Sequence, residues 1–270
     1  MTVTSIDPAQ TGLGIDAQVR ALKASGTPVI AVDARTLHEL APDLIITQDL
    51  CEVCAVADGE VHRLAGSSEP VPRLISLAAR DLGGIWRDIR VVGEALERRE
   101  EAARLVATLE QHIAGLAANP PEVRSRVACI EWLDPLYLAG HWVPELIWAA
   151  GGQDVLSSPG SHSVVREWSD VTGQHPEVVL VAICGFGIAR ALKELGQLDD
   201  NHWLRTTSCP VWVLDGNALT SRPGPRVVEG AGLMQSALRG VARPGLARFT
   251  STSAEFAESS SRTHHLSPLS

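Results

Sequence analysis

The fold is decided by residues 81–118, which read DLGGIWRDIRVVGEALERREEAARLVATLEQHIAGLAA. Apolar residues recur there at intervals of three and four, with charged residues on the opposite side, as in amphipathic helices. The pattern fits two helices that break near residues 96–99, and Asn119-Pro120-Pro121 ends the second. By periodicity alone, residues 81–121 are a pair of packing helices between two other regions.

On the N-terminal side of this pair, residues 1–80 alternate short apolar runs with helical patterns. Strands are predicted at residues 29–32, 44–47 and 73–77, and helices at residues 13–25, 36–40 and 51–64. Continuous β-branched runs separated by helices are typical of strands that are buried on both faces. The region is therefore predicted to be an α/β lobe with a parallel sheet.

The same alternation resumes after the helical pair, over residues 122–242. Strands are predicted at residues 127–132, 178–183 and 211–214, and helices at residues 144–150, 188–195 and 225–241. The predicted fold class is α/β, with two Rossmann-like lobes joined by helices. The tail, residues 243–270, is rich in Ser, Thr and Arg and is predicted to be disordered.

Composition excludes several classes of function. The chain has 270 residues, of which 45% are hydrophobic and 20% charged, as in globular proteins with a substantial core. A net charge of −9 argues against a chain-wide basic surface for nucleic acid or anionic lipid. The sequence shows neither a membrane-spanning run of about 18 apolar residues nor a signal peptide, so as written it is predicted to be cytoplasmic. Its five cysteines, an odd number, favour reduced thiols over a disulfide framework.

The most distinctive local pattern is Gln48-Asp49-Leu50-Cys51-Glu52-Val53-Cys54, directly after the strand at residues 44–47. Ligands gather at the carboxyl ends of parallel strands, and a helix beginning at Asp49 would place both thiols on its first turn. Three interpretations of the thiols compete: a redox-active CxxC, a metal pair completed by His141 or Cys184, or residues that line a ligand cleft or the core. Asp49, Cys51 and Cys54 are therefore candidate ligand-binding residues.

A second pattern is the loop at residues 131–145, EWLDPLYLAGHWVPE, which leaves a predicted strand and enters a helix. Large flat aromatic side chains on a loop suit a planar ligand, although either indole could instead fill the core of the lobe. The candidates are Trp132, Asp134, His141 and Trp142. His141 could ligate a metal axially or hydrogen-bond the periphery of a ligand.

Two more patterns follow the predicted strands at residues 178–183 and 211–214. The first is Cys184-Gly185-Phe186-Gly187, and the second is Asp215-Gly216-Asn217 followed by Ser221-Arg222-Pro223-Gly224-Pro225-Arg226. Arg222 could face a carboxylate or phosphate, or form a structural ion pair. Cys184, Phe186, Asn217 and Arg222 complete the candidate binding residues. No catalytic motif has a recognisable spacing, so the chain is predicted to be a binding protein and not an enzyme.

Together these segments resemble the cobalamin-binding-type substrate-binding proteins of ABC transporters, in the helical-backbone (class III) superfamily. The resemblance covers about residues 5–240 and is most specific in CEVC, GHWVPE and SRPGPR, which begin at Cys51, Gly140 and Ser221. It implies one long backbone helix at about residues 100–118 and a ligand held between the lobes. The implied ligand is cobalamin, a related corrinoid or an iron- or haem-type chelate, with no cofactor required. The implied partner is an ABC permease, for which Glu52 and Glu145 are candidate contacts.

Three departures from this family change the expectations. The usual N-terminal strand and its Ser-Leu-x-Pro-Ser-x-Thr-Glu helix start are not found, so the N-terminal lobe is expected to be reduced and its cleft open. A start upstream of Met1 with a signal peptide would make the protein periplasmic or extracellular. Ala218-Leu219-Thr220 stands where the family often has an aromatic residue, which broadens the expected ligand from cobalamin to tetrapyrroles and metal chelates.

Two other functions remain open from the sequence. One is a thiol oxidoreductase that uses Cys51 and Cys54. The other is an intracellular metal-binding protein that uses Cys51, Cys54, Cys184 and His141, of which Cys51, Cys54 and His141 are the first-choice metal ligands. These functions differ from the leading one in needing no chelate.

Overall fold

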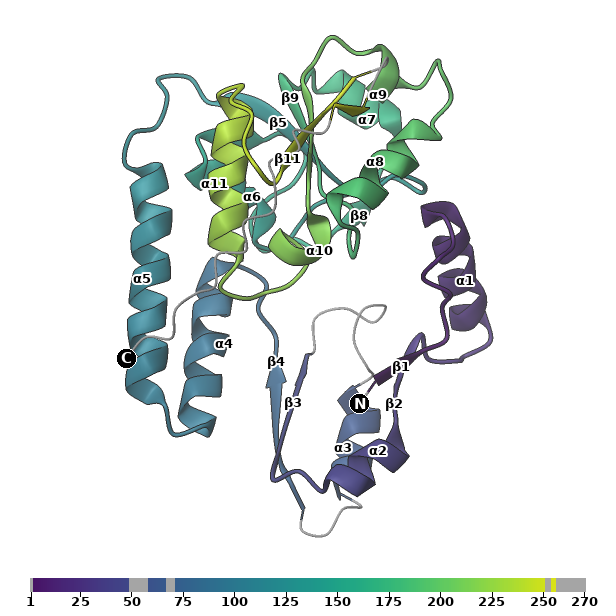
Figure 1. The fold of residues 1–270 in the computed structure, drawn as a ribbon, viewed down its shortest axis with the longest axis vertical. Helices are drawn as coiled ribbons and strands as arrows, with labels where there is room; N and C mark the ends of the chain where they lie inside the picture. The colour runs from purple at the N-terminus through teal and green to yellow at the C-terminus, as the bar shows by residue number, and fades with distance from the viewer. Residues whose placement is uncertain (1, 49–57, 67–70, 251–253, 256–270) are drawn as a thin grey trace.

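A computed structural model describes residues 2–48, 58–66, 71–250 and 254–255. Two α/β lobes lie one above the other, and a pair of long helices runs along one side of both (Figure 1). Within the described ranges, every helix is too short or too polar to span a lipid bilayer.

The N-terminal lobe contains two separate two-stranded sheets. Strand β1 (Thr2–Thr4) pairs antiparallel with β2 (Ile30–Val32), and β3 (Leu44–Gln48) runs parallel to β4 (Arg73–Leu77). The predicted strands are confirmed, but the prediction of one parallel sheet is wrong, because β2 pairs with the first residues of the chain and not with β3. Ile46, on β3, is 44% exposed, as expected for a sheet that is incompletely covered.

Three helices accompany these strands: α1 (Gly12–Ala24), α2 (Ala34–Leu40) and α3 (Asp58–Gly66). The part of the predicted helix that precedes Asp58 lies outside the described residues. Four buried side chains form the core of the lobe, namely Leu37, Ile45, Val61 and Ala65. They come from α2, β3 and α3, so α1 contributes nothing to this core.

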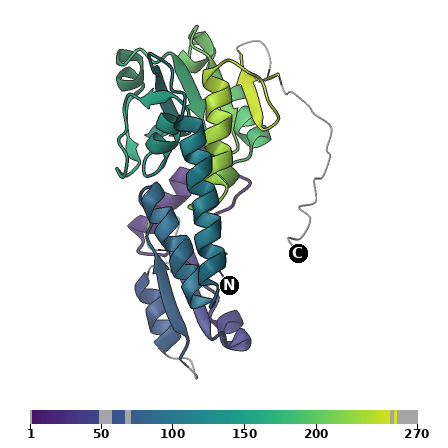
Figure 2. The ribbon, with the colours of Figure 1, turned by 90° about the vertical axis from the view of Figure 1, so that its left-hand side faces the viewer.

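The helical pair breaks where the sequence predicts. Helix α4 (Leu82–Ala95) begins after Asp81, whose side chain accepts a hydrogen bond from the Gly84 amide at 2.6 Å, and α5 spans Arg99–Ala117. Helix α5 packs along α4 at one end and against two helices of the C-terminal lobe at the other (Figure 2). Helices α4 and α5 together therefore connect β4 of the N-terminal lobe to the C-terminal lobe, as the resemblance implies.

The C-terminal lobe is built on an eight-stranded sheet in the order β12-β11-β10-β9-β5-β6-β8, with β7 beside β5. Its strands are β5 (Ser125–Trp132), β6 (Tyr137–Leu138), β7 (Gly152–Asp154), β8 (Val164–Val165), β9 (Val178–Val181), β10 (Val211–Leu214), β11 (Leu246–Phe249) and β12 (Ala254–Glu255). Its helices are α6 (Val143–Ala149), α7 (Trp168–Gly173), α8 (Ile188–Gly196), α9 (Trp203–Thr206), α10 (Gly216–Leu219) and α11 (Val227–Leu238). One buried cluster lies under α6, α11 and the α4–α5 pair, and a second lies under α7, α8 and α9.

The prediction of a disordered tail from residue 243 is wrong for its first part. Strand β11 pairs antiparallel with β10 in the register Val211↔Phe249 to Leu214↔Leu246. Leu246 and Phe249 are buried, at 4% and 6% exposure. By pairing with β10, β11 covers an edge of that strand that would otherwise be unpaired. Residues 256–270 lie outside the described part of the chain.

Candidate functional site

The candidate residues of the C-terminal lobe lie at one edge of its sheet. Strands β5, β9 and β10 are parallel, so their carboxyl ends meet at the same edge. The short helix α10, which directly follows β10, shows that this edge faces the N-terminal lobe (Figure 1). The loops that the sequence singles out after these three strands therefore share one side of the lobe.

Two of these loops meet through an aromatic pair. The ring of Trp132, at the end of β5, lies 5.4 Å from the ring of Phe186 at an interplanar angle of 60°. The guanidinium carbon of Arg190 lies 3.6 Å from the centre of the Phe186 ring. Phe186 is only 3% exposed and its ring supports that of Trp132, so its contact with a ligand stays a prediction. Trp132 remains partly exposed.

Helix α1 of the N-terminal lobe contacts this aromatic pair. The Gly12 amide donates a hydrogen bond to Glu194 Oε2 at 3.0 Å, and Arg190 Nη2 donates one to the Gln10 carbonyl at 2.7 Å. A β-carbon on Gly12 would lie 3.6 Å from Cζ2 of Trp132, so the indole lies against the start of α1. These long-range contacts have no local sequence signal, and Arg190, Glu194 and Gly12 were not among the predicted site residues.

A third loop brings Asn217 and Arg222 together. The Arg222 guanidinium donates hydrogen bonds to the Asn217 side-chain oxygen at 2.9 Å and to its carbonyl at 3.1 Å. Both residues line a cavity of about 270 Å³, together with Ala218, Gly224, Pro225 and Arg226. Among the described residues no carboxylate forms an ion pair with Arg222, whereas Arg226 lies 3.4 Å from Glu229. Asn217 and Arg222 are predicted site residues and Arg226 is not, and the contact of all three with a ligand stays a prediction.

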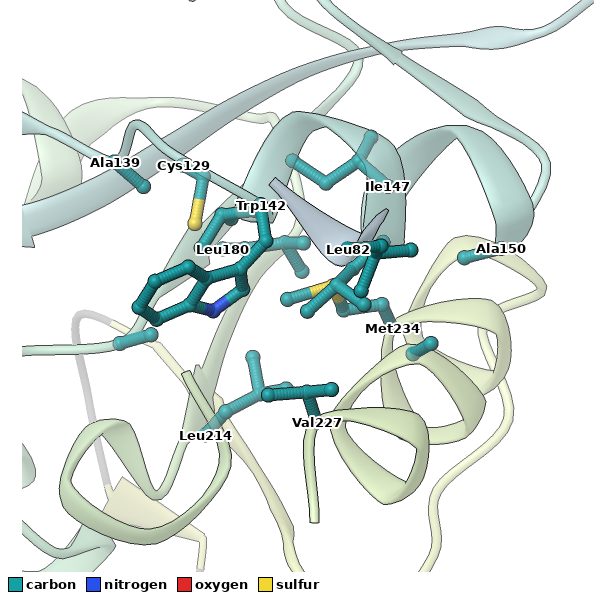
Figure 3. Close-up of a cluster of buried hydrophobic side chains, with 14 of the residues drawn as sticks. Leu82, Cys129, Ala139, Trp142, Ile147, Ala150, Leu180, Leu214, Val227 and Met234 are labelled. Atoms are coloured by element: carbon teal, nitrogen blue, oxygen red, sulfur yellow. The ribbon is translucent and has the colours of Figure 1, made fainter. Parts of the chain in front are cut away.

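The predicted role of Trp142 in a ligand wall is wrong. Its indole is 2% exposed and lies among Leu180, Leu214, Val227 and Met234, which come from the sheet and α11 (Figure 3). The indole Nε1 donates a hydrogen bond to the Thr220 carbonyl at 2.8 Å. Trp142 therefore fills the core, because the loop turns inward immediately before α6.

His141 has a constrained backbone and a half-buried ring. Its φ of 55° is stabilised by hydrogen bonds from its amide to the Ser161 carbonyl, at 2.6 Å, and from the Gly160 amide to its own carbonyl, at 2.9 Å. Its ring lies 5.3 Å from that of His162. Burial, followed by the charges of His162 and Arg80, lowers the pKa of His141, so its imidazole is neutral at pH 7.

The neutral imidazole of His141 retains a lone pair on one nitrogen, and its Nδ1 is buried without a hydrogen-bond partner among the described residues. Such a ring can accept a hydrogen bond or ligate a metal. The contact of His141 with a ligand stays a prediction, and His162 and Arg80 are neighbours that sequence reasoning missed.

Glu145 holds the junction between α6 and α4. Its Oε2 accepts a hydrogen bond from the Leu82 amide, in the first turn of α4, at 2.7 Å. Burial raises the pKa of the Glu145 carboxyl, and the Leu82 hydrogen bond acts in the opposite direction. The residue thus has a structural role, and its contact with a permease stays a prediction.

The remaining candidates are divided between described and undescribed residues. Asp134 is exposed in the turn after β5, and Cys184 is partly buried at the end of β9. Asp49, Cys51, Glu52 and Cys54 lie outside the described residues. Within the described ranges, no group of three or more His, Cys, Asp or Glu side chains is placed to hold a metal ion. Because Cys51 and Cys54 lie outside those ranges, their redox and metal interpretations stay predictions.

Comparison with known proteins identifies the fold. No family model matches the chain, and no curated protein shows a significant match. A periplasmic heme binding protein from Pseudomonas aeruginosa superposes with a TM-score of 0.63 at 17% identity, over 81% of each chain. The periplasmic vitamin B12 binding protein BtuF of Vibrio cholerae gives a TM-score of 0.57 at 19% identity, over 77% of this chain and 80% of its own.

A third similar structure belongs to an ABC-type Fe3+-hydroxamate transport system from Saccharomonospora viridis. Its TM-score is 0.56 at 18% identity, over 77% of this chain and 72% of that one. The chain therefore has the α/β fold of class III periplasmic binding proteins, with two lobes and a backbone helix, as the sequence resemblance implies. The three named structures are solute-binding or transport proteins and not enzymes, and they differ in their ligands.

Proposed function

We propose that this chain is a non-enzymatic substrate-binding protein that captures a metal chelate between its lobes for an ABC-type uptake system. The observation that carries the proposal is the class III fold with the carboxyl ends of β5, β9 and β10 facing the N-terminal lobe. Similar structures are described as binding haem or vitamin B12 or as part of a ferric hydroxamate transport system, so the proposed ligand class is a tetrapyrrole, a corrinoid or an iron chelate.

The charges at this edge favour a ligand with an anionic periphery. The Arg222 guanidinium lines the cavity beside Asn217, and no carboxylate among the described residues pairs with it. Arg80, whose charge helps to lower the pKa of His141, likewise forms no ion pair with any described carboxylate. Guanidinium groups bind carboxylates in a bidentate manner, so a chelate that bears carboxylates would be favoured over a neutral one. Trp132 offers a partly exposed indole for the flat face of such a ligand.

Delivery to a permease and a location outside the cytoplasm follow from the same proposal. Two of the structures named above are described as periplasmic, namely the haem binding protein and the vitamin B12 binding protein. A binding protein of this type meets its permease outside the membrane. We therefore propose a periplasmic or extracellular location in place of the cytoplasmic one expected from the sequence as written.

Titration tests the function. The purified chain is titrated with haemin, cyanocobalamin and a ferric hydroxamate, and tryptophan fluorescence and ligand absorbance are recorded. We expect saturable binding of at least one chelate, and about a tenfold or greater loss of affinity for a carboxylate-bearing chelate in Arg222→Ala. The control Arg239→Ala removes the same charge at an exposed position after α11. If no chelate gives a saturable response, the proposed function is wrong.

A further inference from the structure

Helix α1 belongs to the N-terminal lobe in the sequence, but its first turn contacts the C-terminal lobe. None of its thirteen residues is buried, and it adds nothing to the small core formed by α2, β3 and α3. Ile15 of α1 instead packs against the C-terminal cluster that contains Phe186 and Ala191. Figure 1 shows α1 below α8, with one end near it, on the opposite side of the molecule from α4 and α5.

Two polar contacts hold the start of α1 to α8. The Gly12 amide is one of the first amides of the helix, which have no partner within it, and Glu194 Oε2 accepts its hydrogen at 3.0 Å. The negative charge also lies at the positive end of the helix dipole. One turn earlier in α8, Arg190 donates a hydrogen bond to the Gln10 carbonyl at 2.7 Å. The i, i+4 spacing of Arg190 and Glu194 places both on one face of α8.

The same contacts lie directly over the aromatic pair. Arg190 stacks on Phe186 at 3.6 Å, Phe186 supports Trp132, and Trp132 lies against Gly12. We propose that α1 is a releasable latch between the lobes, closed by Glu194 and Arg190, and that its release uncovers the Trp132–Phe186 pair. The use of this pair as a ligand surface rests on the proposed function, whereas the latch itself does not.

The α4–α5 side and the α1 side of the molecule differ in the contacts that hold each of them to the C-terminal lobe. On the α4–α5 side, a continuous buried cluster joins these two helices to the C-terminal lobe and includes Ile85, Val106 and Leu146, each fully buried. On the α1 side, the junction consists of partly exposed residues and the two polar contacts. Segments with few buried apolar contacts open locally at low cost, while segments in the main core open only with the whole protein. The α1 side is therefore the one that opens.

Gly12 permits a test that leaves the C-terminal lobe unchanged. It is the first residue of α1, where proline is well tolerated, and Thr11 before it has the extended backbone that proline requires (φ −62°, ψ 164°). Gly12→Pro removes the amide hydrogen that Glu194 accepts. The control Gly12→Ala keeps that hydrogen, and its β-carbon would meet Glu194 at 3.4 Å and Trp132 at 3.6 Å, both ordinary contacts.

The experiment measures amide hydrogen exchange and hydroxyl-radical labelling of the ligand-free chain. In Gly12→Pro we expect exchange in α1 to accelerate about tenfold or more relative to Gly12→Ala, with α11 unchanged, and labelling of Trp132 to rise. The double variant Arg190→Ala/Glu194→Ala should act in the same way, whereas Lys193→Ala, an exposed neighbour on α8, should not.

Equal exchange of α1 in Gly12→Pro and Gly12→Ala would overturn the latch. Faster exchange with unchanged labelling of Trp132 would overturn the claim that α1 covers the aromatic pair. Neither measurement uses a ligand, so a chain that binds no haemin, cyanocobalamin or hydroxamate would refute the proposed function and leave the result for the latch intact.

Discussion

Replacing Trp142 by phenylalanine tests whether this indole stabilises the core or binds a ligand. The indole is 2% exposed, and its Nε1 donates to the carbonyl of Thr220, itself 5% exposed, at 2.8 Å. Phenylalanine keeps an aromatic ring but leaves that carbonyl unsatisfied, which costs about 1–3 kcal/mol. The smaller ring adds a cavity term of about 1 kcal/mol. We therefore expect the free energy of unfolding to fall by about 2–4 kcal/mol, equivalent to a Tm lower by about 5–15 °C.

The measurement is urea denaturation followed by circular dichroism, together with the chelate titration on the folded variant. The control is Trp148→Phe, on helix α6, which begins directly after Trp142. Trp148 is 54% exposed, so only the stacking of Arg124 at 3.6 Å is weakened and the loss should stay below about 1 kcal/mol. We expect chelate affinity to be unchanged in both variants. A Trp142→Phe variant of normal stability but reduced affinity would refute the assignment of this indole to the core.

Three further predictions concern stability. Burial raises the pKa of Asp154 from 3.8 to about 6, so the folded state binds more protons than the unfolded state between these values. Asp154 should therefore lower the free energy of unfolding by up to about 3 kcal/mol from pH 4 to pH 6.5, and Asp154→Asn should reduce the slope by this share in urea titrations at each pH. Gly216→Ala would force a β-carbon into the Ile183 carbonyl oxygen and should cost several kcal/mol. Gly232→Ala, with open space in α11, should stabilise by about 0.5–1 kcal/mol in the same assay. Glu145→Ala should lower the free energy of unfolding by about 1–2 kcal/mol and speed amide exchange in the first turn of α4. Glu145→Gln keeps an acceptor for the Leu82 amide, so both effects should be much smaller.

Much of the fold follows from local sequence patterns. The strands at Arg73–Leu77 and Val211–Leu214 and the break between α4 and α5 lie where hydrophobic periodicity places them. Strand β11 was missed because its sequence, Leu246–Phe249, carries an arginine and follows a polar segment. Its position depends on the exposed edge of β10, and an edge is a property of the assembled sheet, not of any local window.

The candidate site was less predictable, because it depends on which way each side chain turns. Trp132 and Trp142 occur in one loop with similar neighbours, yet one lies partly exposed beside α1 and the other lies in the core. Asn217 and Arg222 were predicted because they follow a buried strand, where ligands gather, and the structure places both at one cavity. Gly12 and Glu194 are 182 positions apart, and no pattern of short range relates them.

The contacts between the lobes also bear on how a ligand could enter. On one side Glu145 accepts a hydrogen bond from the first turn of α4, and α4 and α5 pack against the C-terminal lobe over a buried cluster. On the other side α1 is held through Gly12 and Arg190 at residues that are not fully buried. A chelate with a rigid ring would have to enter where separation costs less, because a packed core does not deform continuously. The α1 side meets that condition, and the indole of Trp132 is what a ligand entering there would contact first.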